Sequence, residues 1–212
     1  MENFSLTLLI IILTCITSFM AFNNAALRGS ALFYPFAMAN RGEWYRFLTS
    51  GFIHADFLHL GVNMYVLYSF GVILEKMYLP LFFGDTANLV YVGIYFFGMI
   101  VSDIPSFIKH RRDATYRGLG ASGAVAAVLF ATILIGPFNG EIGLLFIPGL
   151  GIPPIVFGIL YLFYSAYMGR AGRDNINHDA HFYGAVFGFI FPGIFKPELF
   201  LFLIEQIKFQ LA

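Results

Sequence analysis

One serine in the sequence stands between glycines at the start of an apolar stretch. The run Gly120-Ala121-Ser122-Gly123 follows the most basic part of the chain, residues 109–117, and opens the apolar run 124–135. Glycines leave room for another segment to approach closely. Polar side chains inside apolar helices are rare and commonly functional. Ser122 is therefore a candidate nucleophile.

A histidine further along the chain has a matching environment. His181 precedes Gly184 and Gly188, and all three fall on one side of a helix. Glycines four residues apart let two helices pack closely. The helix that begins near the serine offers a matching small surface: Gly120, Gly123, Ala124 and Ala127. Packing of these surfaces would bring an imidazole beside a serine, as nucleophilic catalysis requires. The alternative is a packing motif that contains a satisfied core histidine.

Donors for a developing oxyanion are expected from two places. The Ser122 backbone N–H lies at a helix N-terminus, where such groups have no partner within the helix. His59 and Asn63 are four residues apart, so they share one helical face, and His54 comes five residues before His59. Asp179 lies two residues from His181 and points elsewhere on a helix. A Ser–His dyad is therefore expected rather than a triad.

The composition defines the setting in which these residues act. The chain has 212 residues, of which 59% are hydrophobic and 11% charged, whereas soluble domains carry about 25% charged residues. A polytopic protein of the lipid bilayer is expected. The net charge near zero argues against nucleic-acid binding, and the single Cys15 excludes an intrachain disulfide.

Other chemistries lack their usual residues. No His-Glu-x-x-His run is present, so no metal and no other cofactor are expected. The aspartates fall in or near loops and helix ends, which disfavours a paired-aspartate site. A transporter or channel would prefer charged residues at mid-membrane depth, and none is convincing.

Apolar runs predict an all-α fold in a single domain, 1–212. A spanning helix needs about 20 mostly apolar residues. Pro80 and the pair Lys196-Pro197 are expected to end the second and sixth helices, an apolar tail follows at 199–204, and the aromatic-rich loop 23–52 is expected in the membrane interface. Prolines and glycines near the start of the fifth segment indicate a broken or re-entrant beginning. The six expected helices are 4–22, 56–78, 87–107, 120–135, 144–168 and 180–195.

The parity of these helices places the polar residues together. His59, Ser122 and His181 lie near the starts of the second, fourth and sixth helices, and even-numbered helices all start on the same side of the membrane. At 1.5 Å rise per residue, this places the three side chains roughly 5–10 Å below the interface. Water would reach such a site from one side only.

These motifs, in this order, resemble those of the rhomboid intramembrane serine proteases. Gly120-Ala121-Ser122-Gly123 is similar to the family's nucleophile motif, and His181 with Gly184 and Gly188 resembles its histidine motif. His54, His59 and Asn63 resemble the motif of its second helix. Further similarities are Trp44-Tyr45-Arg46 with Thr49 in the first loop, and Glu75 at the end of the second helix.

The resemblance implies a fold, a site and a location. It implies a six-helix bundle with a membrane-embedded first loop, in which Ser122 is the nucleophile and His181 the general base and acid. His59 and Asn63 would line the oxyanion site, with His54, Arg46, Glu75 and the motif glycines in structural support. Transmembrane proteins would be the substrates, cleaved near their outer ends. The protein would be a multi-pass protein of a bacterial inner membrane.

Two features depart from the family pattern. Many bacterial relatives carry an aromatic residue four positions after the serine, where this chain has Ala126, so Tyr183 or an aromatic residue of a neighbouring helix must support His181. The positive-inside rule also conflicts with the family's orientation, because it would place the active site toward the cytoplasm. Nine of the twelve Lys and Arg residues lie on the active-site side of the expected topology: Arg28, Arg41, Arg46, Lys109, Arg111, Arg112, Arg117, Arg170 and Arg173.

Two functions remain open at this point. The first is an intramembrane serine endopeptidase. The second is a catalytically silent rhomboid-like protein that binds membrane helices for quality control. Loss of the serine or the histidine would mark the second class, and both residues are present.

Overall fold

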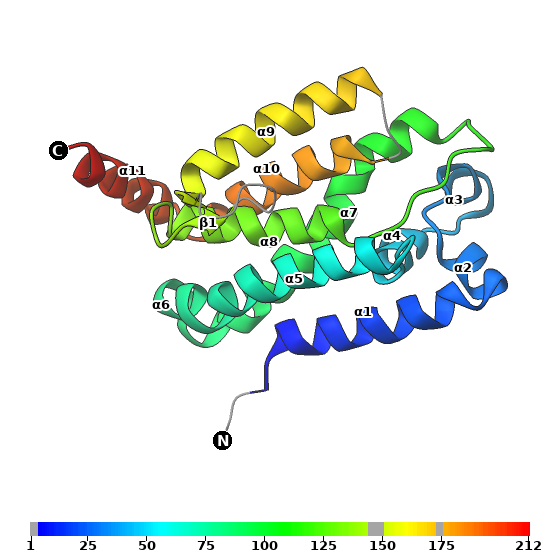
Figure 1. Ribbon diagram of the computed structural model, residues 1–212, viewed down its shortest axis with the longest axis horizontal. Helices are drawn as coiled ribbons and strands as arrows, with labels where there is room; N and C mark the ends of the chain where they lie inside the picture. Colours follow the sequence, from blue (N-terminus) through cyan, green and yellow to red (C-terminus); the bar gives the residue numbers. More distant parts are fainter. Residues whose placement is uncertain (1–3, 144–150, 173–175) are drawn as a thin grey trace.

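The computed structural model describes residues 4–143, 151–172 and 176–212. Almost all regular structure in these residues is helical (Figure 1). Two two-residue strands, β1 (Ile142–Gly143) and β2 (Gly151–Ile152), pair antiparallel. The long helices are α1 (Leu6–Phe22), α5 (Phe57–Ile73), α7 (Ala87–His110), α8 (Ser122–Ile135), α9 (Pro154–Ala171), α10 (His178–Phe195) and α11 (Glu198–Leu211).

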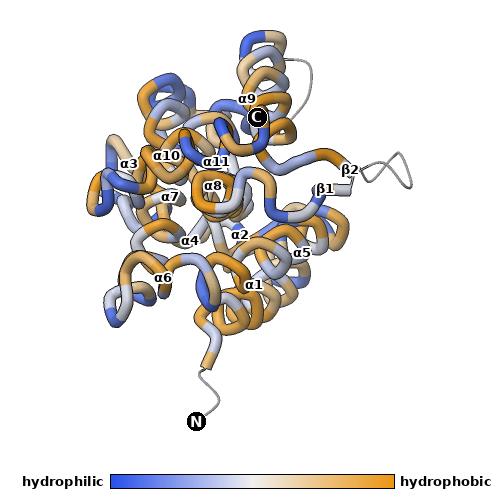
Figure 2. Tube along the Cα trace, turned by 90° about the vertical axis from the view of Figure 1, so that its left-hand side faces the viewer, coloured by the Kyte–Doolittle hydropathy of each residue, from blue (hydrophilic) through white to orange (hydrophobic). Residues whose placement is uncertain are grey.

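Helix α8 lies at the centre of the bundle. Every residue from Gly123 to Ile135 is buried, and the helix is apolar on all sides, as expected of a core helix. Helices α5, α7, α9 and α10 surround it, and α1 packs on the outer side of α5 (Figure 1). Figure 2 shows hydrophobic residues along the outer helices too. Large apolar side chains such as Leu89, Phe163 and Ile194 are exposed, as expected of surfaces that meet lipid.

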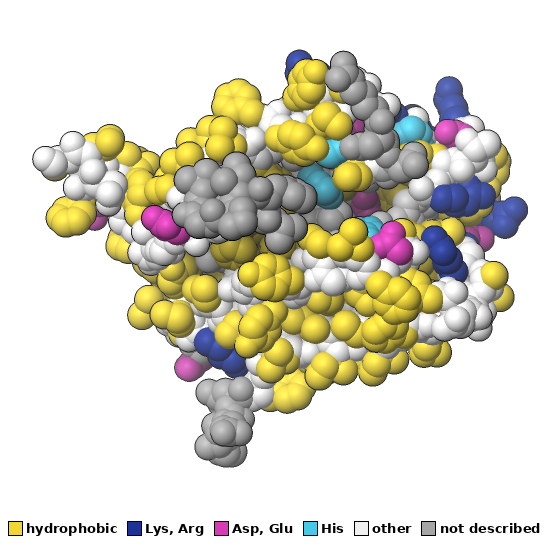
Figure 3. Space-filling view, in the orientation of Figure 1, with side chains coloured by type: hydrophobic (Ala, Val, Ile, Leu, Met, Phe, Trp, Pro, Cys, Tyr) yellow, Lys and Arg dark blue, Asp and Glu magenta, His cyan; other side chains and the backbone are white. Residues whose placement is uncertain are grey.

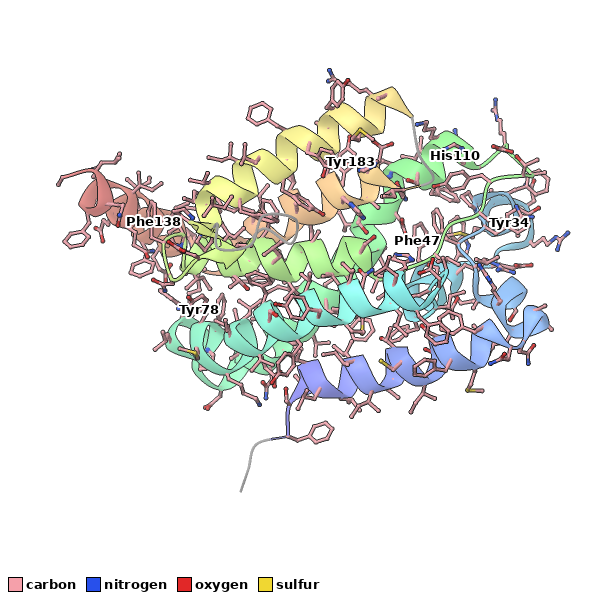
Figure 4. The ribbon with its side chains drawn as sticks, viewed as in Figure 1. Tyr34, Phe47, Tyr78, His110, Phe138 and Tyr183 are labelled. Atoms are coloured by element: carbon pink, nitrogen blue, oxygen red, sulfur yellow. The ribbon has the colours of Figure 1, made fainter. Side chains whose placement is uncertain are left out.

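The expected interfacial loop is folded rather than extended. It contains α2 (Ala25–Ala31), α3 (Pro35–Arg41), α4 (Arg46–Thr49) and a 3₁₀ turn, η1 (Ser50–Phe52), gathered at one end of the bundle. The ring of Phe107 on α7 contacts Trp44 and Phe47, with centroids 5.3 and 5.8 Å apart. Figure 4 shows Tyr34, Phe47 and His110 at this end, and Tyr78 and Phe138 at the opposite end.

Several expected helix boundaries were wrong. Pro80 does not end the second helix: α5 passes into a π-helical turn, η2 (Leu74–Tyr78), and then into α6 (Leu79–Phe83), where proline fits because it occupies the first turn. The third helix, α7, continues three residues beyond its expected end at 107.

The last two expected segments also differ. The fifth segment is helical from Pro154, where proline again occupies the first turn, and residues 144–150 of its predicted start lie outside the described residues. The apolar tail after Pro197 is a complete helix, α11. It turns by 113° from α10, because Lys196-Pro197 interrupts the helix between them.

Length and composition identify fewer membrane-spanning helices than expected. Among the described residues, the helical run 57–110 is long and apolar enough to cross a membrane and counts as one candidate, although it contains both α5 and α7, with a turn at Gly84 (φ 49°) between them. The bent pair α10 and α11 qualifies only if the two helices count as one span. Helices α1 and α8 are apolar but have only 17 and 14 residues.

A buried carboxylate fastens the start of α1 to the end of the second helical segment. Glu75 in η2 accepts hydrogen bonds from the Leu6 and Thr7 backbone N–H groups, at 2.9 Å each, and from the hydroxyls of Ser5 and Thr7. The ammonium group of Lys76 lies 2.8 Å from the same carboxylate. An anion is stabilised by the unpaired N–H groups of a helix N-terminus. Glu75 therefore holds α1 against the bundle, at the end opposite α2–α4.

Replacing this carboxylate is expected to destabilise the protein. Glu75→Gln keeps the shape but weakens bonds that depend on charge, at a cost of about 1–3 kcal/mol in the free energy of unfolding. Thermal unfolding in detergent measures the loss. The matched control is Glu198→Gln, because the Glu198 side chain is 56% exposed and should change little. Equal unfolding temperatures for wild type and Glu75→Gln would contradict this role.

Candidate active site

The backbones of α8 and α10 touch beside the candidate nucleophile. A Cβ atom added to Gly184 would collide with the carbonyl oxygen of Gly123, and one added to Gly188 would collide with that of Ala127. The carbonyl oxygen of Ala180 is 3.4 Å from the position of a Cβ on Gly123. The small surfaces expected from the sequence therefore face each other.

Ser122 is the first residue of α8 and is partly buried. It directly precedes Gly123, whose neighbour across the helix contact is Ala180, the residue before His181. The serine and the histidine thus lie on adjoining turns of two touching helices. Figure 3 shows histidine side chains, in cyan, grouped on one face of the molecule.

The ring that supports His181 comes from α9. The Tyr161 ring is stacked on His181, with centroids 6.2 Å apart and planes inclined by 22°. Tyr183 was one residue expected in this role. It is instead 43% exposed and packs edge-on against Phe182 (Figure 4). In a helix, Tyr183 points about 200° away from His181, so the two side chains lie on opposite faces. Support from a neighbouring helix was the other expectation.

A polar network missed at the sequence level holds the start of α10. The Asn177 side chain caps α10 by accepting from the Ala180 N–H at 3.1 Å, and Ser106 donates to the same oxygen at 3.0 Å. The amide nitrogen of Asn177 donates to the Asp103 carboxylate at 3.3 Å. Ser106 and Asp103 are three residues apart on α7, a spacing that places both on one face. This network fixes the start of α10, which begins at His178, three residues before His181.

The ring of His59 packs against Gly120, two residues before Ser122. A Cβ on Gly120 would fall 2.7 Å from Cε1 and 2.9 Å from Nε2 of His59, and the Gly120 φ of 113° also excludes most side chains. Gly120 was expected to face α10, so this part of the prediction was wrong. The Ala55 N–H donates to His59 Nδ1 at 3.4 Å, so in a neutral ring Nε2 carries the proton.

Asn63 is buried one turn further along α5. Its amide nitrogen donates to the His59 carbonyl oxygen at 2.9 Å, which uses one of its two N–H bonds. The geometry therefore provides two side-chain donors on the face of α5 that His59 and Asn63 share.

His54 connects α1 to the segment before Ser122. Its Nε2 accepts from the Ala121 N–H at 3.4 Å, so Nδ1 carries the proton and meets the Ser18 hydroxyl at 3.0 Å. Burial lowers the pKa of His54 to about 3, and the ring is therefore neutral at physiological pH. This histidine fixes backbone rather than supplying a proton.

The first loop also holds the backbone that leads into α8. Phe33 and Gly118 exchange two backbone hydrogen bonds, of 2.9 and 3.0 Å, and the Gly120 N–H donates to the Ser50 carbonyl at 2.9 Å. The segment that leads to Ser122, at the start of α8, is therefore held by backbone hydrogen bonds to the first loop.

Buried Arg46 fastens the loop itself. Its guanidinium group donates to the carbonyl oxygens of Gly29 and Leu32 and pairs with Glu43 at 2.6 Å. The Thr49 hydroxyl donates to the Ala31 carbonyl at 3.0 Å. Because its charge is engaged within the protein, Arg46 acts here as an anchor for the loop.

The carboxylate two residues before His181 pairs with a lysine of α7. The Asp179 carboxylate lies 3.8 Å from the Lys109 ammonium group. Within the described ranges of the chain, no three of the His, Cys, Asp and Glu side chains gather as a metal site would need.

The α8–α10 contact gives a test of the packing. Gly184→Ala drives a methyl group into the Gly123 backbone, and overpacking of this kind costs about 1–3 kcal/mol. A clear fall in the unfolding temperature in detergent is expected. Gly61→Ala is the control, because no atom lies within 4 Å of a Cβ added to this α5 glycine. If both variants unfold alike, the two helices do not touch as described.

The comparisons with known proteins agree on one family. The Rhomboid domain model matches residues 41–198. The chain is similar to rhomboid protease GluP of Bacillus subtilis, at 30% identity over 70% of this chain and 25% of the relative. It is also similar to RHOMBOID-like protein 12, mitochondrial, of Arabidopsis thaliana, at 30% identity over 68% of this chain and 44% of the relative.

A third relative has a more similar length. Putative rhomboid protease YdcA of Bacillus subtilis is 30% identical over 74% of this chain and 69% of its own length. The chain thus spans a quarter of GluP and less than half of the plant protein, which both contain sequence outside the match. The matched region includes the contact of α8 with α10 and the last part of the first loop, from Arg41 onward. The chain belongs to the rhomboid family of membrane proteins.

Proposed function

We propose that this protein is an intramembrane serine endopeptidase that cleaves transmembrane segments with a Ser122–His181 dyad. The observation that carries the proposal is the contact of Gly123 with Gly184 and Ala180, because it puts the serine and the histidine on adjoining turns. Family membership supports the same activity.

The proposed membrane arrangement has six spans. Helices α1, α5, α7, α8, α9 and α10 run roughly alongside one another in Figure 1. The shorter ones, α1 and α8, reach less than the full hydrocarbon thickness of about 30 Å, and local thinning of the bilayer accommodates short helices at modest cost. Central α8 needs no lipid contact, because its side chains are buried by protein.

The proposed reaction proceeds through an acyl-enzyme. The Ser122 hydroxyl oxygen attacks the scissile carbonyl carbon while its proton passes to His181. Collapse of the tetrahedral intermediate breaks the C–N bond, and the leaving amine takes the proton from His181. A water molecule then attacks the acyl carbon and gives a proton to the same imidazole. Collapse of this second intermediate breaks the C–O bond to Ser122, and the serine oxygen takes the proton back from His181 as the new carboxyl end leaves.

The proposed oxyanion site lies between α5 and the start of α8. The Ser122 N–H, the His59 Nε2–H and the Asn63 amide would donate to the developing negative charge. Gly120 lets the His59 ring approach, since a Cβ there would overlap it. Donors held in place before the reaction stabilise the transition state without reorganisation.

The proposed substrate is a transmembrane segment with weak helical propensity at the cleavage point, because attack requires an extended backbone. The segment expected to bend aside and admit it runs from about 144 to 161; its start, 144–150, lies outside the described residues, and the described part is the first half of α9. Helix α9 has few buried side chains, and several large apolar ones are exposed: Val156, Ile159, Leu160, Phe163, Tyr164 and Tyr167. A helix with few buried contacts opens at low cost.

Substitution of the dyad tests the proposed activity. The full chain, purified in detergent, is expected to cleave a model transmembrane substrate, and Ser122→Ala or His181→Ala to abolish cleavage. A fluorophosphonate probe is expected to label wild type but neither variant, because the label needs both the hydroxyl and the base. Gel mobility of substrate and labelled protein measures both outcomes.

The control is Ser69→Ala, since the Ser69 hydroxyl binds only the Tyr65 carbonyl of its own helix at 2.9 Å and should be dispensable. Cleavage that survives in Ser122→Ala, or that only chelators stop, would refute the dyad. Substrate capture without any cleavage by wild type would favour the silent, helix-binding alternative.

The oxyanion donors are expected to affect turnover more than binding. His59→Ala and Asn63→Ala each should lower kcat about 100-fold or more, as loss of one such donor does in other hydrolases, with a small change in KM. Kinetics on the model substrate separates the two constants. A variant that raises KM and leaves kcat intact would assign that residue to substrate binding instead.

A further inference from the structure

The ring beneath His181 belongs to the helix that is proposed to move. Tyr161 of α9 is stacked on His181, as described above. On α8, the residue one turn after Ser122 is Ala126, which offers only a methyl group to this region and is itself buried. The aromatic ring that lies nearly parallel to the imidazole therefore comes from α9 and not from the nucleophile's own helix.

Other aromatic rings hold Tyr161 in place. Its centroid is 5.6 Å from that of Phe130 on α8 and 6.0 Å from that of Phe157 on α9. Ring contacts of this kind favour a fixed orientation, each by about 2- to 12-fold in an equilibrium constant. Tyr161 thus contacts α8 and α10 together, and its position depends on how α9 lies against both.

A second ring pair continues the contact along the same two helices. Tyr164 meets His178 edge-on at 5.6 Å, and His178 meets His181 edge-on at 5.7 Å. Two successive residues on the histidine face of α10 are therefore bordered by two tyrosines of α9. These pairs lie toward the end of α10 that carries the proposed base.

Beyond these rings, α9 is less closely packed. An apolar cavity of about 190 Å³ lies between α8, α9 and α10, and Gly158, Leu162, Phe130 and Phe189 are among its lining residues. The buried residues of α9 are few: Pro154, Gly158 and Ser165. The aromatic contacts at Tyr161 and Tyr164 are thus a major part of what docks α9.

We propose that Tyr161 is a positioning residue for His181, so that the base is correctly held only while α9 is docked. The inference rests on the proposed protease function. A substrate that enters by displacing α9 also removes the ring that supports the imidazole. Proton transfer then follows the return of α9, and opening alone does not produce an active site.

Removal of the Tyr161 ring tests this inference. Tyr161→Ala is expected to lower kcat about 10- to 100-fold, as small displacements of catalytic groups do, without raising KM for the model substrate. Labelling of Ser122 by the small fluorophosphonate probe should slow similarly, although this probe does not need α9 to move. Tyr161→Phe keeps the ring and should retain most of the wild-type kcat.

A second substitution offers a rescue. Ala126 and Tyr161 belong to the same apolar cluster, so a ring at position 126 can enter the space that Tyr161→Ala vacates. The double variant Tyr161→Ala, Ala126→Phe is expected to recover at least threefold in kcat over Tyr161→Ala. If Tyr161 only stabilises the fold, the double variant would regain the wild-type unfolding temperature without this recovery in kcat.

The controls separate the ring from general packing. Phe163→Ala removes a ring that is 73% exposed on α9 and should leave kcat unchanged. Tyr161→Leu fills similar space without a flat face, and it should resemble Tyr161→Ala in kcat. If Tyr161→Ala does not fold, the comparison of Tyr161→Leu with Tyr161→Phe decides the question.

The inference and the proposed function fail in different ways. Wild-type protein that neither cleaves nor takes the phosphonate label refutes the protease function itself. Wild-type protein that does both, with Tyr161→Ala or Tyr161→Leu equal to it in kcat and labelling rate, refutes only the role of Tyr161.

Discussion

Two helix backbones meet where Gly184 of α10 rests on Gly123 of α8, and no side chain larger than hydrogen fits between them. The rest of the site depends on this contact, because a wider separation would carry His181 away from Ser122. One turn after Ser122, α8 carries Ala126 and therefore offers no ring to the histidine. An aromatic side chain must then be supplied from another helix, and α9 supplies it with Tyr161.

The two residues of the proposed dyad are held by separate parts of the chain. The segment before Ser122 is tied to the first loop by Phe33 and Ser50 and to α1 through His54. The start of α10 is tied to α7 by the Asn177 amide. Both sets of contacts fix the backbone with directional hydrogen bonds. The contact of α8 with α10 between them consists of close packing of small residues.

Periodicity made part of this arrangement predictable. Glycines and alanines at intervals of three and four residues lie on one face of a helix, and this spacing is a local property of the sequence. The facing surfaces of α8 and α10 could therefore be inferred. Family resemblance pointed to the residues of the site. Helix parity brought His59, Ser122 and His181 to one end of the bundle, where the structure places them near each other.

Other contacts could not be read from spacing. Stacking of Tyr161 on His181 depends on the rotation of α9, which local sequence does not determine. The contact of Gly120 with His59 follows from a left-handed backbone turn just before α8 rather than from helix geometry. Pro80 was a misleading signal, because proline is tolerated in the first turn of a helix. The Asp103–Asn177 bond joins residues 74 positions apart.

The carboxylate of Glu75 has a consequence for how the chain is made. Helix α1 is synthesised before Glu75, so the polar groups of its first turn at first lack the carboxylate that they bind in the folded protein. That partner arrives only with residue 75, after α5 has been synthesised. The first turn of α1 therefore gains its full set of hydrogen bonds only when a segment about 70 residues further along the chain has folded beside it.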